Sequence, residues 1–260
     1  MANELDSDTW NLLHGIMTDV KFAKISDQIE NTAHLTATGL TLSYGDGDSI
    51  TYAVQGISLC FPNRGFFGVI GPSGSGKSSL LYLLSGLKQP TTGSVEYRSV
   101  SLAAGKERDR AELRRKYFGF VFQQPFLLNH LTARENVLIA SRIDDTDSAI
   151  HVQKVLEELG IGHLAGRYPA HLSGGERQRL VVARAMISEP SIIFADEPTA
   201  SLDHTNGSAV VNLLKKYRTR GTVIMVTHDP DMLTEADGIY HLRDGKLDRY
   251  DNSKQTISDI

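Results

Sequence analysis

The chain has 260 residues, of which 40% are hydrophobic and 22% are charged, and its formal net charge at pH 7 is −4. These values are typical of a soluble globular protein, and the weak acidic charge gives no general attraction to nucleic acid or anionic lipid. The single cysteine, Cys60, excludes an intrachain disulfide and a multi-cysteine zinc site, and it favours a reduced cytosolic location.

The first 35 residues differ in pattern from the rest of the chain. Apolar residues recur every three or four positions from Trp10 to Val20, after the possible cap Ser7 and among acidic residues, which predicts an amphipathic helix. Such a helix packs on its own domain, is partly disordered, or docks on a partner, and its acidic charge disfavours a membrane surface. The start of the chain also lacks the layout of a secretory signal.

Two β-strands are predicted between Leu35 and Phe61, on either side of a turn signal at Gly45 to Asp48. Tyr44 ends the first of these runs, upstream of the glycine-rich loop described next. An aromatic ring at that place can stack on a nucleotide base. On the local pattern alone, a packed sheet tyrosine is an equal alternative.

A glycine-rich loop follows the apolar strand Phe66 to Ile70 and precedes a predicted helix. Its spacing is G-x-x-x-x-G-K-[ST], in which backbone N–H groups converge on phosphate oxygens at a helix N-terminus. The predicted phosphate-binding residues are Gly71, Ser73, Gly74, Ser75, Gly76, Lys77, Ser78 and Ser79. Lys77 would bring a charge to the β- and γ-phosphates and Ser78 an oxygen to Mg²⁺. The alternative is a Gly/Ser turn followed by an accidental Gly-Lys-Ser.

The next part of the chain contains short strands and helices, and its last two predicted helices form a largely helical insertion. The predicted elements are a turn at 89–93, a strand at 94–97, a helix at 109–117, a strand at 118–122 and helices at 132–142 and 146–160. The strand ends on Gln123. Leu156, Leu159, Ile161 and Leu164 form the expected core-facing stripe.

A second helix start with two glycines follows at Ser173 to Glu176. Ser173 can cap this helix, and Gly174 and Gly175 let another group approach its positive end. A plain capping motif is the alternative.

Two acidic residues, Asp196 and Glu197, end the apolar strand 192–195. Open α/β sheets bind their ligands at such strand ends, where Asp196 suits Mg²⁺ and Glu197 can polarise a water. Alone, the pair could be a charge effect at the start of a helix, but beside a phosphate loop we prefer the functional interpretation. A helix is then predicted from 200 to about 219, a strand at 222–227 and a hairpin at 238–250. His228 follows the strand and can reach a γ-phosphate, unless it is an ordinary surface histidine.

Taken together and in this order, the motifs resemble those of the ATP-binding-cassette (ABC) transporter ATPases, from about residue 35 to residue 250. The resemblance implies an α/β fold, namely a P-loop NTPase core with a mixed sheet, an N-terminal antiparallel β-subdomain and a helical insertion. The implied division is an extension at 1–35, an ABC ATPase domain at 36–250 with its helical subdomain at about 124–186, and a polar tail at 251–260.

The resemblance also implies a role for each motif residue. The expected catalytic residues are Glu197, His228, Lys77 and Gln123, and the expected Mg²⁺ ligands are Ser78, Gln123 and Asp196. Tyr44 would stack on the adenine. The signature residues Ser173, Gly174, Gly175 and Glu176 would contact the γ-phosphate of ATP held by a second copy of the chain.

The implied function is ATP hydrolysis that powers a membrane transporter through ATP-driven, head-to-tail dimerisation, with the membrane subunits on separate chains at the inner face of the cell membrane. Gly119 to Gln123 and Glu135 to Val137 are similar to the macrolide-exporter and lipoprotein-releasing branch, which favours export, extraction or mechanotransmission. The alternative is a soluble ABC-type ATPase that acts on DNA or ribosomes, although the chain has neither a long coiled coil nor a second cassette. A metabolite kinase would not account for Leu172 to Glu176.

Overall fold

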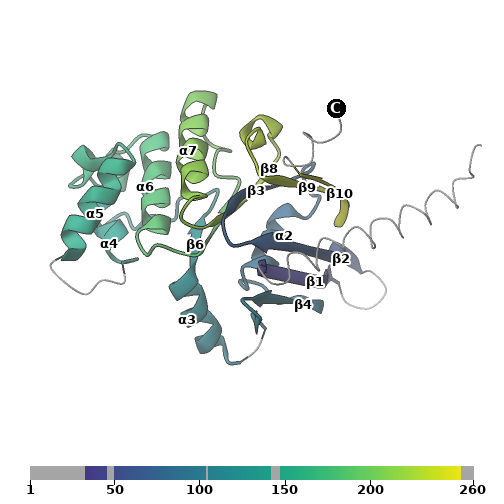
Figure 1. Cartoon of the computed structure of the whole chain (residues 1–260). Helices are drawn as coiled ribbons and strands as arrows, with labels where there is room; N and C mark the ends of the chain where they lie inside the picture. The colour runs from purple at the N-terminus through teal and green to yellow at the C-terminus, as the bar shows by residue number, and fades with distance from the viewer. Residues whose placement is uncertain (1–32, 46–49, 104, 142–146, 253–260) are drawn as a thin grey trace, which may run out of the picture.

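The computed structural model describes residues 33–45, 50–103, 105–141 and 147–252. The predicted amphipathic helix near the N-terminus lies outside these residues, and so does most of the polar tail. Two β-sheets and six α-helices make up the described fold (Figure 1). None of these helices has the length and apolar character that crossing a membrane requires.

The smaller sheet is antiparallel and confirms the predicted N-terminal strands. It contains β1 (Ala33–Tyr44), β2 (Thr51–Pro62), β4 (Thr92–Tyr97) and β5 (Val100–Ser101), in the spatial order β2-β1-β4-β5. Residues 45–50 connect β1 and β2, so that Tyr44 at the end of β1 pairs with Thr51 at the start of β2.

The larger sheet has the order β10-β9-β3-β8-β7-β6. Its strands are β3 (Gly65–Ile70), β6 (Phe118–Val121), β7 (Ile192–Asp196), β8 (Thr222–Thr227), β9 (Gly238–Arg243) and β10 (Lys246–Asn252). All neighbouring pairs are parallel except β9 with β10. Parallel strands end at one edge, so this topology brings the predicted motifs after β3, β6, β7 and β8 to the same edge.

The helices are α2 (Lys77–Leu84), α3 (Glu107–Tyr117), α4 (Ala133–Leu138), α5 (Asp147–Glu158), α6 (Gly174–Met186) and α7 (His204–Tyr217). Helices α4 to α7 gather on one side of the larger sheet, and the smaller sheet lies on the other side (Figure 1). Short 3-10 turns at Gly162–Leu164, Pro169–His171 and Pro230–Leu233 connect the elements.

Neighbouring residues of the central strands serve two separate cores. On β8, Val223 and Met225 pack with α4 to α7, whereas Ile224 and Val226 pack with α2 and the smaller sheet. Successive side chains of a strand point to opposite faces, and a sheet covered on both faces therefore has continuous apolar strands. Every residue of β8 is buried accordingly.

The largest differences from the predicted helix bounds are at the end of α4 and at the start of α7. Helix α4 stops at Leu138 rather than near 142, because Ala140 N–H bonds to Val137 O and Ser141 N–H bonds to Leu138 O in tight turns. Helix α7 begins at His204 rather than at 200, because the Asp203 side chain accepts a bond from the N–H of Asn206 and caps the helix.

Candidate functional site

The glycine-rich loop joins β3 to α2 and leaves the start of that helix without a side-chain cap. Gly76 is the N-cap residue, with a φ of 98°, a conformation that side chains with a Cβ rarely adopt. The first N–H groups of a helix have no intrahelical acceptor, so they are available to an anion here. Ser73 and Gly74 are exposed at the tip of the loop, and Ser78 and Ser79 are half-buried in the first turn of α2.

Three remote segments shape this loop. A Cβ at Gly76 would lie 2.0 Å from the carbonyl oxygen of Ala53 on β2, and a Cβ at Gly71 would lie 2.1 Å from that of Leu242 on β9. Gly245, in the turn between β9 and β10, donates its N–H to Ser75 O at 3.1 Å. The loop is therefore held between the smaller sheet and the C-terminal hairpin. We call the three contacting residues, Ala53, Leu242 and Gly245, the loop cradle.

Lys77 folds its side chain back across the loop. Its Nζ donates to the carbonyl oxygens of Gly71 at 2.9 Å and Pro72 at 3.0 Å. The same Nζ lies 3.9 Å from Oε1 of Glu197, which follows β7. The Lys77 side chain is 7% exposed, so its charge is little screened by water and would act strongly on a phosphate bound in the loop.

Asp196 ends β7 directly beside α2 and receives two hydroxyl groups. Ser78 Oγ donates to Oδ1 at 2.7 Å, and Tyr82 Oη donates to Oδ2 at 2.7 Å. Burial, followed by the hydrogen bond to Asp196 and the charge of that carboxylate, raises the pKa of Tyr82 to about 12. The phenol therefore stays a donor at neutral pH.

Glu197 and His228 meet at the ends of β7 and β8. Glu197 is turned away from the strand by a φ of 44°, and its N–H bonds to Val226 O at 3.0 Å. Its Oε2 lies 2.9 Å from Nδ1 of His228. One carboxylate thus contacts an imidazole through one oxygen and approaches Lys77 through the other.

The second helix start is closed by its own side chains. Ser173 N–H donates to Oε2 of Glu176 at 2.7 Å, and Glu176 N–H donates to Oγ of Ser173 at 3.3 Å, which is a capping box. The backbone N–H and then the hydroxyl of Ser173 lower the pKa of Glu176. Gly174 is exposed, whereas Gly175 is buried because the Asn206 side chain approaches it. Helix α6 packs on one face of the larger sheet and α2 on the other, and Figure 1 shows the two helices apart, so the helices that carry the two loops are separated within one chain.

Two predicted residues stand at the margin of this site. Gln123 is exposed just beyond β6, and within the described part of the chain its side chain makes no hydrogen bond to Asp196 or Glu197. The segment around it is anchored on α6, since Arg184 donates to Phe126 O at 2.7 Å and to Pro125 O at 3.0 Å. Tyr44 is 46% exposed, and the Lys88 ammonium contacts its hydroxyl and lies 4.2 Å from its ring centroid.

The sequence interpretation missed Tyr82 and Lys88. Tyr82 follows Ser78 by four positions, which places both on one face of α2, and that spacing was the available signal. Nothing local indicated Lys88, because its contact with Tyr44 depends on how the loop after α2 returns to β1.

The residues fit a nucleotide and a magnesium ion. An uncapped helix start, glycines that leave no space for a Cβ and a concentrated ammonium group suit phosphate. Among the described residues no group of three His, Cys, Asp or Glu could hold a metal on its own. Magnesium commonly takes one carboxylate and further oxygens from the substrate phosphates, and the adjacent oxygens of Ser78 and Asp196 offer such a set.

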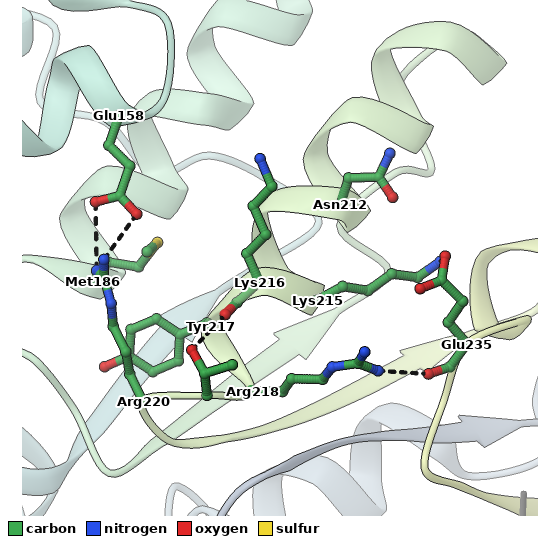
Figure 2. Close-up of a pocket in the computed structure, with 10 residues that line it drawn as sticks. Glu158, Met186, Asn212, Lys215, Lys216, Tyr217, Arg218, Arg220 and Glu235 are labelled. Atoms are coloured by element: carbon green, nitrogen blue, oxygen red, sulfur yellow. Dashed lines mark hydrogen bonds and ion pairs between the residues drawn. The ribbon is translucent and has the colours of Figure 1, made fainter.

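A separate hollow of about 660 Å³ lies at the C-terminal end of α7 (Figure 2). Three of its cations have partners: Arg220 pairs with Glu158 at 3.1 Å, Lys215 pairs with Glu235 at 3.3 Å, and Arg218 donates to the carbonyl oxygen of Glu235 at 3.2 Å. None of the residues that line this hollow belongs to the phosphate loop or to the strand ends that carry Asp196, Glu197 and His228, so the hollow is not part of the candidate site.

Comparisons with known proteins agree with this geometry. The family model described as ABC transporter matches residues 54–200. An ABC transporter ATP-binding protein, MJ1508 of Methanocaldococcus jannaschii, is 43% identical over 208 residues, covering 78% of this chain and 93% of that protein. The macrolide export ATP-binding/permease protein MacB of Escherichia coli is 38% identical over 80% of this chain and 33% of its own length.

A solved structure shows the same arrangement of elements. The dimeric ATP-binding cassette MJ0796, bound to ADP and Pi in a post-hydrolysis state, superposes with a TM-score of 0.75 at 34% identity, covering 84% of this chain and 98% of the other. Since the family model spans more than half of the chain and MJ1508 is 43% identical over 78% of it, the chain belongs to the ABC transporter family, as an ATP-binding cassette.

Proposed function

We propose that two copies of this cassette close head to tail around ATP and Mg²⁺, and that hydrolysis drives membrane subunits carried on other chains. As an ABC cassette the chain is an ATPase that powers transport. What we propose beyond this is the role of each site residue, the binding of Mg²⁺ and the presence of a membrane partner.

The observation that carries the catalytic assignment is the 2.9 Å contact between Glu197 and His228 beside the phosphate loop. A carboxylate in that position can orient a water and accept its proton as it attacks the γ-phosphate. His228 contacts Oε2 of Glu197, and Oε1, which lies 3.9 Å from Lys77 Nζ, becomes available to the water when Lys77 binds a phosphate. Lys77, now bonded to two loop carbonyls, has a stronger partner in a phosphate, which is an anion.

The phosphates would be held by the backbone and side chains of the loop. This set is Gly71, Ser73, Gly74, Ser75, Gly76, Lys77, Ser78 and Ser79. Ser78, Asp196 and Gln123 would hold Mg²⁺, which neutralises charge on the β- and γ-phosphate oxygens when bound. Tyr44, exposed at the end of β1, would stack on the adenine.

The second copy would complete the site with its Ser173 to Glu176 loop. This assignment is supported by the separation of the two loops within one chain and by the dimeric cassette that this chain resembles. Helix α6 carries that loop at its start. Farther along the same helix, Arg184 donates hydrogen bonds to the carbonyl oxygens of Pro125 and Phe126, close to Gln123. A displacement of α6 on dimer closure would therefore move the segment that leads to the helical subdomain.

The membrane partner is proposed from the relatives. MacB carries its permease on the same chain and is named for macrolide export, and the branch motifs of this chain are similar to its group. We therefore place this cassette at the inner face of the cell membrane, held by membrane subunits, in an export, extraction or mechanotransmission complex.

The test is Glu197→Gln. We expect ATP hydrolysis to fall by about 100-fold or more, because the general base is lost, and ATP-bound dimers to accumulate on size-exclusion chromatography. Glu112→Gln, an exposed carboxylate on α3, is the matched control and should behave as wild type. Hydrolysis at the wild-type rate in Glu197→Gln would exclude the proposed role of Glu197.

Affinity purification from membranes separates transport from the alternative. A multi-helix membrane protein should purify with the cassette. Ribosomes or DNA in its place would favour the soluble ABC-type ATPase and overturn the proposed partner.

A further inference from the structure

Both oxygens of the Asp196 carboxylate are occupied by hydroxyl groups from one helix face. Ser78 and Tyr82 lie four residues apart on α2 and donate to Oδ1 and Oδ2 respectively, each at 2.7 Å. Asp196 itself is 5% exposed. A buried carboxylate with a donor on each oxygen has a fixed rotation about its side-chain bond.

The two donors differ in their relation to the phosphate loop. Ser78 belongs to the loop motif and stands next to Lys77, at the first turn of α2. Tyr82 lies one turn farther along, and its ring packs edge-on against Phe122, with 6.5 Å between the ring centroids. Phe122 in turn stacks on Phe120 of β6 at 5.7 Å. The phenol therefore reaches Asp196 from a ring that is packed against Phe122, one helical turn beyond Ser78.

We propose that Tyr82 is a positioning residue of the metal site, which holds Oδ2 of Asp196 so that Oδ1 faces Ser78 and the divalent cation. The inference rests on the proposed function, in which Ser78 and Asp196 bind that cation. Without the phenol, the Oδ2 atom loses its donor, and the buried carboxylate is free to rotate away from the orientation that the metal requires. Groups that orient a metal ligand commonly change metal affinity by about 10- to 100-fold.

A purely structural role makes a different prediction. A buried tyrosine hydroxyl normally finds an acceptor, and its loss then reduces stability without changing metal affinity. Tyr217 provides this comparison within the same chain. It is 2% exposed, and its hydroxyl donates to Pro190 O at 2.8 Å, at the far end of α7.

The experiment measures Mn²⁺ binding rather than turnover. The parent is the full chain with Glu197→Gln, saturated with ATP, and free Mn²⁺ is followed by electron paramagnetic resonance during a titration. We expect Tyr82→Phe to raise the Mn²⁺ dissociation constant about tenfold, and Tyr217→Phe to leave it within twofold of the parent. ATP binding in the presence of EDTA should be equal in all three proteins, because the phenol does not touch the loop.

Three results would overturn the proposal. The first is an unchanged Mn²⁺ dissociation constant in folded Tyr82→Phe, and the second is an equal weakening in Tyr217→Phe. The third is a parent that binds no Mn²⁺ beyond that taken by free ATP, and it alone also removes the proposed metal site. Thermal melts confirm folding, and Tyr82→Met, which also lacks the hydroxyl, replaces Tyr82→Phe if that variant does not fold.

Discussion

The helices α2 and α6 both begin with a turn rich in glycine and serine, but only α6 has a side-chain cap at its first residue. Helix α2 starts at Gly76 without a side-chain cap, whereas α6 starts at Ser173 with a closed capping box. The N–H groups at the start of α2 therefore have no side-chain acceptor and are available to a ligand. The second loop is already satisfied by Glu176, so a phosphate that approaches Ser173 N–H competes with a carboxylate. The loop before α2 is thus open to a phosphate, whereas the loop before α6 must exchange a bond within its own capping box for a bond to a phosphate.

The largest effect should come from Gly76→Ala, which changes the backbone of the phosphate loop at the start of α2. A Cβ would meet Ala53 O at 2.0 Å, and the φ of 98° is strained for alanine. The new atom must displace backbone, so we expect ATP binding to fall below detection by calorimetry and stability to drop by about 2 to 4 kcal/mol.

Gly74→Ala is the matched control. Its φ of 79° is also positive, but no atom lies within 4 Å of the added Cβ. Its cost should be about 1 to 2 kcal/mol from the conformation alone. Equal ATP affinity in the two variants would contradict the claim that the loop cradle shapes the site.

Ser173→Ala should separate dimerisation from nucleotide binding. Loss of the cap costs about 1 kcal/mol of stability, and ATP affinity of the single cassette should not change. In a Glu197→Gln background we expect the ATP-dependent dimer to weaken by about tenfold or more on analytical ultracentrifugation, because one hydrogen bond to a charged group is worth about 1.5 to 3 kcal/mol.

Helix α4 supplies the control for Ser173→Ala. Thr132 and Glu135 form the same capping box there, at 3.3 and 2.7 Å. Thr132→Ala should cost similar stability and leave dimerisation intact. A dimer lost equally in both variants would indicate general destabilisation instead.

The smallest effect should come from Glu176→Gln, which keeps the shape of the second loop and removes its charge. We expect ATP-dependent dimerisation to strengthen about two- to fivefold at low salt, and the gain to shrink as salt screens the repulsion between Glu176 and the incoming phosphate. Glu135→Gln on α4 should show no gain. A weaker dimer in Glu176→Gln would show that the carboxylate helps the contact rather than opposing it.

The same substitution has a consequence for pH. Because Ser173 lowers the pKa of Glu176, the capping box contributes its stability above the unfolded-state pKa of about 4.3 and loses it as the pH falls through the lower folded value. Thermal melts from pH 7 down to pH 3 should therefore show a smaller loss of stability on acidification in Glu176→Gln than in the wild type.

Local patterns predicted the parts of the site that are contiguous in sequence. Both glycine-rich loops, the apolar strand before Asp196 and the strand before His228 were identified because each is marked by a few adjacent residues. The parallel order of β3, β8 and β7 then brings these marks to one edge.

Contacts between distant segments were not predictable. Tyr82 and Asp196 are 114 residues apart, and their hydrogen bond depends on how closely α2 packs against β7. The positive φ of Glu197 is equally hidden, since glutamate has no preference for that conformation and only the surrounding structure imposes it. Periodicity reports which face of an element is buried, and it carries no information on which partner covers that face.

Because the loop cradle includes residues far along the chain, the nucleotide site cannot take its final shape until those residues have been synthesised. A protein leaves the ribosome N-terminus first, at roughly 5 to 20 residues per second. The glycine-rich loop between β3 and α2 therefore emerges well before Leu242 and Gly245 of the C-terminal hairpin, which line it and bond to it. A nascent cassette therefore carries its nucleotide motif without the contacts that shape it until the hairpin of β9 and β10 has formed.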